Sequence, residues 1–94
     1  MLDYLVEFIG TFIFLSVILL TGEAIPIAIA LAAAIYFGGK VSGGNFNPAV
    51  STAMLMLGKL EPGKYIGYVV AQLFGAIAAF TYYGMTAKNN KPIA

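Results

Sequence analysis

The residues of this chain that are best suited to act on a solute are Asn47, Pro48 and Ala49, which separate a glycine-rich stretch from an apolar run. Asparagine is a favoured helix N-cap, and proline suits the next position, where the backbone needs no amide hydrogen. A helix is therefore expected to begin at Asn47, with the positive end of its dipole there. The Asn47 amide would add a hydrogen-bond donor. Together these groups favour a neutral solute with lone pairs and oppose a cation.

The sequence offers few residues for other kinds of chemistry. It contains no Cys, His or Trp among its 94 residues, so zinc sites and histidine-activated nucleophiles are excluded. The four carboxylates are scattered, and no basic run could hold nucleic acid. We therefore predict no enzyme, no catalytic residue, no metal or other cofactor and no nucleic-acid partner.

The composition indicates that the partner is the lipid bilayer. Hydrophobic residues make up 61% of the chain and charged residues 10%, whereas soluble domains carry about 25% charged residues. A membrane span needs about 20 apolar residues. Three segments approach or reach that length, at about 4–20, 24–40 and 65–85, joined by a tight turn at 21–23 and a polar loop at 58–64. The expected fold is an all-α, multi-pass integral membrane protein with a single domain over residues 1–94.

A fourth helix is expected over about 47–57, and it is too short to cross a membrane. At about 1.5 Å per residue it covers roughly half of a hydrocarbon core that is about 30 Å thick. The loops on either side of it would then lie on the same side of the bilayer. We interpret this segment as re-entrant: it enters to mid-membrane as a loop and returns as a half-helix. The alternative is an amphipathic helix on the membrane surface.

Three motifs in this chain resemble those of one family. The run Ser42-Gly43-Gly44-Asn45-Phe46-Asn47-Pro48-Ala49-Val50-Ser51 is similar to the first NPA loop of the aquaporins and aquaglyceroporins, the major intrinsic proteins. Glu7-Phe8-Ile9-Gly10-Thr11-Phe12 resembles the first helix of that family, and Ala71-Gln72-Leu73-Phe74-Gly75-Ala76 resembles its third. Their order and spacing match across about residues 4–86, which corresponds to half of the aquaporin-like fold.

The resemblance implies a passive channel for water or small neutral solutes such as glycerol. Members of the family have two inverted repeats whose half-helices meet at the midplane, and this chain matches the first repeat only. Three and a half helices cannot enclose a protected pore. A lone protomer would also leave loop backbone facing lipid, at a cost of several kcal/mol per unsatisfied group. We expect an antiparallel homodimer, with a tetramer of such dimers conceivable by analogy. The alternatives are a non-conducting structural protein and one half of a heteromeric channel.

The resemblance also implies roles for individual side chains. Glu7 should hydrogen-bond the backbone of the NPA loop, with Gln72 giving similar polar support; otherwise Glu7 would extend to the lipid headgroups. Lys40 and Asn45 stand where the family often has His and are expected at the pore vestibule, although Lys40 could simply extend to water. No Arg is available for the narrow filter of the family.

In a homodimer the positions of that filter would be filled by apolar or small residues. The candidates are Ile27 of one chain with Ile35, Gly44 and Val50 of the other. This ring should favour glycerol-like solutes at least as much as water, unless it dewets and closes.

Three further patterns bear on assembly, anchoring and orientation. A stripe of small residues (Gly67, Ala71, Gly75 and Ala79) could serve a contact between protomers or packing within one chain. Five tyrosines near the span ends are expected to anchor the protein at the membrane interface, namely Tyr4, Tyr65, Tyr68, Tyr82 and Tyr83. The lysines divide three against two between the two sides, a weak bias that is compatible with insertion in both orientations.

Overall fold

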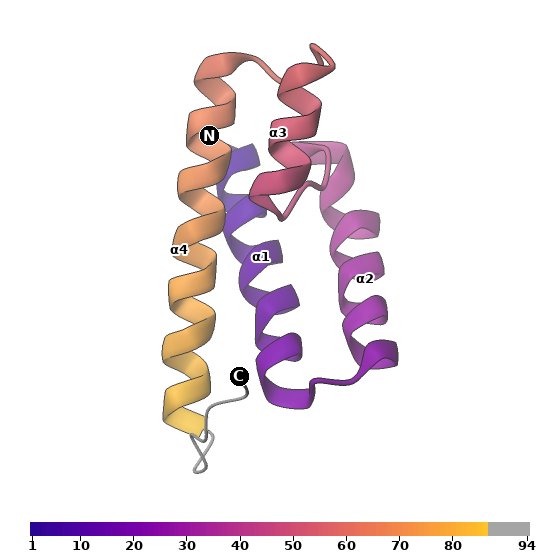
Figure 1. Ribbon diagram of the computed structural model, residues 1–94, viewed down its shortest axis with the longest axis vertical. Coiled ribbons are helices and arrows are strands. Elements are labelled where there is room, and N and C mark those ends of the chain that lie inside the picture. The colour runs from indigo at the N-terminus through magenta and orange to yellow at the C-terminus, as the bar shows by residue number, and fades with distance from the viewer. Residues whose placement is uncertain (87–94) are drawn as a thin grey trace.

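The described part of the chain, residues 1–86 of a computed structural model, consists of four helices joined by short connections (Figure 1). They are α1 (Leu2–Thr21), α2 (Ala24–Ser42), α3 (Pro48–Met56) and α4 (Pro62–Thr86). Helix α1 ends where Gly22 adopts a left-handed conformation with φ of 61°, and α2 ends in the same way at Gly43. Glycine closes these helices because it has no β-carbon to clash in that conformation.

Helix α1 lies at the centre of the bundle. It packs against α2 on one side and α4 on the other, while α3 packs against α4 at one end of the molecule (Figure 1). The contact between α1 and α4 is close, since a β-carbon built on Gly75 would lie 2.8 Å from the carbonyl oxygen of Phe8. One built on Gly67 would lie 2.5 Å from the Tyr4 ring. The glycines of the small-residue stripe therefore serve packing within the chain.

The predicted fold class is confirmed: residues 1–86 have an all-α fold with three long helices and one shorter helix. The long helices have 20, 19 and 25 residues and are apolar enough to cross a membrane. The boundary of α4 differs from the prediction. Residues 62–64, which were expected in the polar loop, form the first turn of α4 instead. Pro62 accounts for this, because proline fits the opening turn of a helix.

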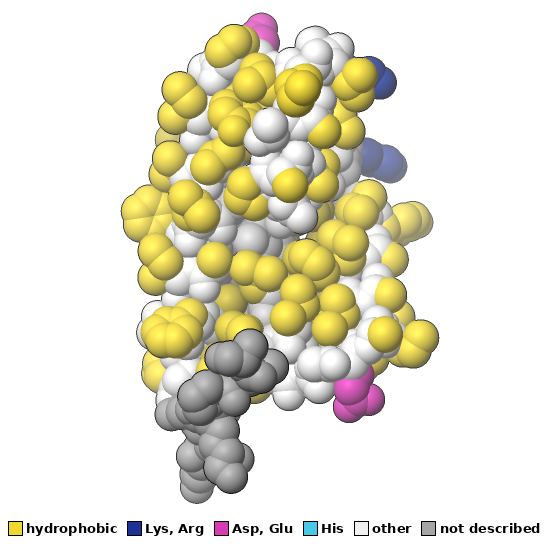
Figure 2. Space-filling model, viewed as in Figure 1, with side chains coloured by type: hydrophobic (Ala, Val, Ile, Leu, Met, Phe, Trp, Pro, Cys, Tyr) yellow, Lys and Arg dark blue, Asp and Glu magenta, His cyan; other side chains and the backbone are white. Residues whose placement is uncertain are grey.

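Polar side chains fill the interior of the molecule, and apolar ones cover its exterior. Among the described residues, the buried polar or charged positions outnumber the buried hydrophobic ones. The polar set is Asp3, Glu7, Thr11, Ser16, Ser42, Asn45, Ser51 and Gln72, and the hydrophobic set is Ala30, Phe46, Tyr68 and Ala79. Figure 2 shows apolar side chains over most of one face, with charged groups near its two ends and on the upper part of its right edge. This distribution suits a hydrocarbon solvent.

The charges at the end of the bundle where α4 begins are partly paired. Lys64 forms an ion pair with Asp3 and lies 5.7 Å from the centre of the Tyr4 ring. Lys40, in the last turn of α2, and Lys59, in the connection between α3 and α4, are also exposed. The remaining lysines, Lys88 and Lys91, lie outside the described residues. So does the C-terminal tail, which the sequence predicts to be exposed and frayed.

Candidate pore site at the tip of helix α3

The tip of α3 is built by Asn47 and Pro48. Asn47 is extended (φ −161°, ψ 125°), and its Oδ1 accepts a hydrogen bond of 2.8 Å from the backbone N–H of Ala49. Pro48 occupies the first helical position, as its fixed φ favours. Asn47 is exposed, and its side-chain nitrogen has no hydrogen-bond partner among the described residues. The N-terminus of α3 therefore presents a free amide donor beside the positive end of the helix dipole.

The carboxylate of Glu7 holds the loop that precedes this tip. Its Oε2 accepts hydrogen bonds from Ser42 Oγ at 2.8 Å and from the backbone N–H of Asn45 at 3.0 Å. Its Oε1 accepts from the backbone N–H of Phe46 at 2.7 Å and from Gln72 Nε2 at 2.9 Å. Glu7 is completely buried, and two donors on each oxygen match the acceptor-only pattern of a carboxylate.

Ser51 extends the same network into α3. Its hydroxyl accepts 2.8 Å hydrogen bonds from Asn45 Nδ2 and from Gln72 Nε2, and Ser51 is completely buried. Glu7, Ser42, Ser51 and Gln72 come from α1, α2, α3 and α4 respectively, so the buried network joins all four helices. Each of the four helices thus contributes a side chain that holds the loop, either directly or through Glu7 and Ser51.

Tyr68 is a member of this site that the sequence did not reveal. Its hydroxyl donates a 2.6 Å hydrogen bond to the carbonyl oxygen of Ser42, and only 3% of the residue is exposed. The prediction that Tyr68 anchors the protein at the membrane interface was wrong, because the ring faces the bundle. The one available signal was its spacing: Tyr68 and Gln72 lie four residues apart and share a face of α4.

Comparison with known proteins identifies the family of the chain. The family model of the major intrinsic proteins matches residues 15–92. The chain belongs to the major intrinsic protein family. Relatives include glycerol uptake facilitator protein-like 6 of Lactiplantibacillus plantarum, which is 44% identical over 84% of this chain and 41% of that protein. Aquaporin-9 of Homo sapiens is 39% identical over 88% of this chain and 34% of its own length.

The chain spans less than half the length of these relatives. Aquaporin Z of Brucella melitensis biotype 1, for example, is 43% identical over 62% of this chain but over only 25% of its own length. No solved structure gives a significant match. Family membership and the three long apolar helices establish an integral membrane protein.

The remaining predicted site residues of this family member are placed as follows. Ile35 and Gly44 are adjacent, because a β-carbon built on Gly44 would lie 3.5 Å from Cα of Ile35. Val50 and Ile27 are half-buried, on α3 and near the start of α2. That these four residues meet in one ring remains a prediction, because the ring requires a second chain. Gln72 lies with Glu7 inside the network.

The two vestibule candidates are placed very differently. Lys40 is exposed in the last turn of α2, where it can reach water. Asn45 is buried instead, with 7% exposed, because its side-chain amide donates to Ser51. Its place in the network gives Asn45 a structural contact that the sequence did not predict.

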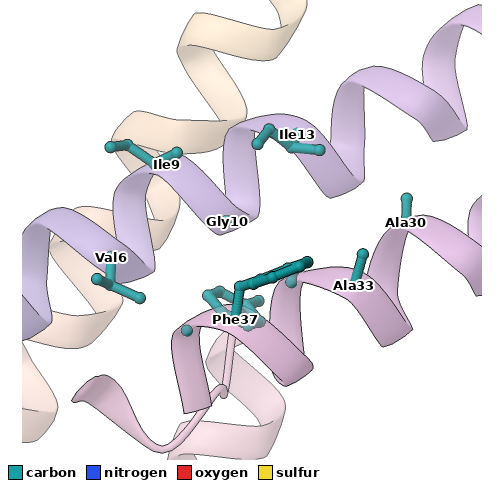
Figure 3. A pocket seen from close by; sticks show the side chains of 10 residues that line it. Val6, Ile9, Gly10, Ile13, Ala30, Ala33 and Phe37 are labelled. Atoms are coloured by element: carbon teal, nitrogen blue, oxygen red, sulfur yellow. The ribbon is translucent and has the colours of Figure 1, made fainter. Parts of the chain in front are cut away.

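A separate apolar groove of about 310 Å³ lies between α1 and α2 (Figure 3). Its walls include Val6 and Ile13 of α1 and Ala30 and Phe37 of α2, and it is joined to the loop only through Phe46. The lining offers no polar side chain to a solute, and Asn47 takes no part in it. The groove is therefore distinct from the candidate pore site.

Proposed function

We propose that this chain forms a passive transmembrane channel for water and small neutral solutes such as glycerol. The observation that carries the proposal is the tip of α3, where a helix N-terminus and the unpartnered amide of Asn47 are held open by a buried network. The relatives named above, a glycerol uptake facilitator-like protein and two aquaporins, support the same solute class.

The mechanism follows from the chemistry of that tip. A water molecule or an alcohol hydroxyl accepts a hydrogen bond from Asn47 and passes on without any covalent step. A cation meets the positive end of the helix dipole, about half an elementary charge, and is opposed. The Glu7 network keeps these donors in place, so no reorganisation is needed as each solute passes. Flow follows the concentration or osmotic gradient, which requires no enzyme activity, metal or cofactor.

We propose that a second copy, inserted in the opposite orientation, completes the pore. Helix α3 covers only one end of the face between α2 and α4, and its tip is directed toward the middle of the bundle (Figure 1). The tip would otherwise face lipid, where free backbone and amide groups are costly. A copy related by a two-fold axis in the membrane plane would bring its own α3 to the other end of that face. The two tips would then meet, as inverted repeats do.

In such a dimer the candidate filter is formed by residues of both chains. Ile27 of one protomer would join Ile35, Gly44 and Val50 of the other. This ring carries no charge, which favours glycerol-like solutes at least as strongly as water. By analogy with the family, four dimers could assemble together.

Reconstitution of the purified chain tests the conduction proposal. Proteoliposomes that contain only this chain should swell rapidly after an osmotic step and in isotonic glycerol. Swelling no faster than that of empty liposomes would refute the homodimeric channel. It would leave a structural role or a heteromeric channel, and swelling restored by a second-repeat chain would identify the latter.

Insertion in both orientations can be tested separately because the chain has no cysteine. Single thiols can be introduced by Lys59→Cys, in the connection between α3 and α4, and by Glu23→Cys, in the turn between α1 and α2. These two connections lie at opposite ends of the bundle (Figure 1). In sealed vesicles, a membrane-impermeant thiol reagent should label about half of each variant if orientations are equal. Complete labelling of one variant and none of the other would refute the antiparallel dimer.

A further inference from the structure

Phe46, immediately before Asn47, has an unusual backbone for its residue type. Its φ is 56°, in the left-handed region, and Phe46 is the one non-glycine residue there among residues 1–86. A bulky side chain rarely adopts this conformation and needs compensating contacts to stay in it. Phe46 is also buried, with 2% of its surface exposed, although the next residue, Asn47, is exposed. These features mark a residue that its surroundings hold firmly.

The ring of Phe46 occupies a slot between α1 and α2 whose walls are Gly10 and Gly38; we call this the glycine slot. A β-carbon built on Gly10 would lie 2.1 Å from Cε1 of Phe46, and one built on Gly38 would lie 3.2 Å from Cζ. The ring fills the space that side chains at these positions would need. It also forms part of the lining of the apolar groove shown in Figure 3.

The backbone of Phe46 is fixed from a second direction. Its N–H donates a 2.7 Å hydrogen bond to Glu7, while its ring is held by the glycine slot. With both ends of the residue fixed, the direction in which the chain leaves Phe46 is set. That direction determines where Asn47, the next residue, places its amide.

We propose that Phe46 is a positioning residue whose ring, held in the glycine slot, aims Asn47 and the tip of α3 at the solute path. This inference rests on the proposed function for its consequence in transport, but its structural half can be tested without transport. It also makes the separation of α1 and α2 a determinant of where the tip points, because both helices form the slot.

Hydrogen exchange of the loop amides tests the structural half. In the intact chain, the N–H groups of Asn45 and Phe46 are protected by Glu7. Phe46→Ala, which removes the ring, and Gly10→Ala, which obstructs the slot, should each speed exchange in residues 43–47 by about tenfold or more. Gly84→Ala is the matched control, since a β-carbon there would have no neighbour within 4 Å. Unchanged loop exchange in both variants would overturn the proposal.

A double variant tests whether the ring and the slot act on one another. Phe46→Ala removes every ring atom that a methyl at position 10 would strike. Gly10→Ala combined with Phe46→Ala should therefore lose no more loop protection than Phe46→Ala alone. Protection in the middle of α4 should stay at the parent level throughout, which separates a displaced loop from general unfolding. Additive losses in the double variant would overturn the direct contact between ring and slot.

Solute permeability tests the transport half in the same proteoliposomes. If the parent conducts, Gly10→Ala and Phe46→Ala should each lower glycerol permeability by about tenfold, because small displacements of a preorganised group are costly. The double variant should lower it no further than Phe46→Ala alone. Faster loop exchange with unchanged permeability would overturn the positioning role. A parent that does not conduct would refute the proposed function, and the exchange measurements would still decide whether Phe46 holds the loop.

Discussion

Replacing Glu7 by glutamine should destabilise the bundle, because it replaces one acceptor oxygen with a donor at a completely buried hydrogen-bond centre. The glutamine side chain has the same shape but keeps one acceptor oxygen. Its amide nitrogen fits best in place of Oε2, where the Ser42 hydroxyl can turn and accept from it. The backbone N–H of Asn45 then faces another donor and loses its partner.

The size of the effect follows from these losses. A buried donor without a partner costs about 1–3 kcal/mol. The hydrogen bonds from Phe46 and Gln72 to the other oxygen remain, but each loses about 1 kcal/mol as its acceptor becomes neutral. A neutral side chain is less costly to bury, which offsets part of the total. We therefore expect Glu7→Gln to lower the free energy of unfolding by about 2–4 kcal/mol.

The measurement is unfolding of the micelle-bound protein by dodecyl sulfate, followed by circular dichroism. Glu23→Gln is the control, because Glu23 is an exposed carboxylate in the turn between α1 and α2 and should change stability by less than about 0.5 kcal/mol. Equal stability losses in the two variants would show that the Glu7 network contributes nothing specific and would refute the reasoning.

Three other predictions concern the tip and the packing around it. Asn47→Asp keeps the oxygen that caps α3 but adds a negative charge, so the variant should fold and should leak cations through proteoliposomes; conductance equal to that of the parent would count against the pore assignment. Gly75→Ala places a methyl group 2.8 Å from the Phe8 carbonyl oxygen and should lower the free energy of unfolding by about 1–3 kcal/mol. The control Gly84→Ala should leave that free energy nearly unchanged, and similar losses in the two variants would contradict the close α1–α4 contact. Tyr68→Phe should lose about 1 kcal/mol because the carbonyl at the end of α2 loses a donor, and an unchanged unfolding midpoint would argue against that hydrogen bond.

Local sequence signals were sufficient to predict the four helices. Long apolar runs predict the three long helices because each must satisfy its own backbone in lipid. The Asn-Pro pair at 47–48 predicts the start of α3 because cap and first turn depend on adjacent residues. The start of α4 was predicted three residues late, since a proline between polar residues is compatible with either a loop or a first helical turn.

The hydrogen-bond partners of the site were less accessible from sequence. Glu7 drew attention as a carboxylate within an apolar span, which is costly unless it is paired. Ser51 and Tyr68 gave no such signal, because a serine in a short helix and a tyrosine near a span end are ordinary. Their roles depend on residues 21 and 26 positions away in the chain, Gln72 and Ser42, and only the packed bundle brings those together.

The sequence by itself determined that this protein is a helical membrane protein with a capped half-helix, because hydropathy and capping act over a few neighbouring residues. Only the tertiary structure decided that Ser51 joins the Glu7 network, that Asn45 points inward, and that Phe46 enters a slot between two glycines. Those contacts join residues from separate helices, and their geometry is fixed by how closely the helices approach one another rather than by any local pattern.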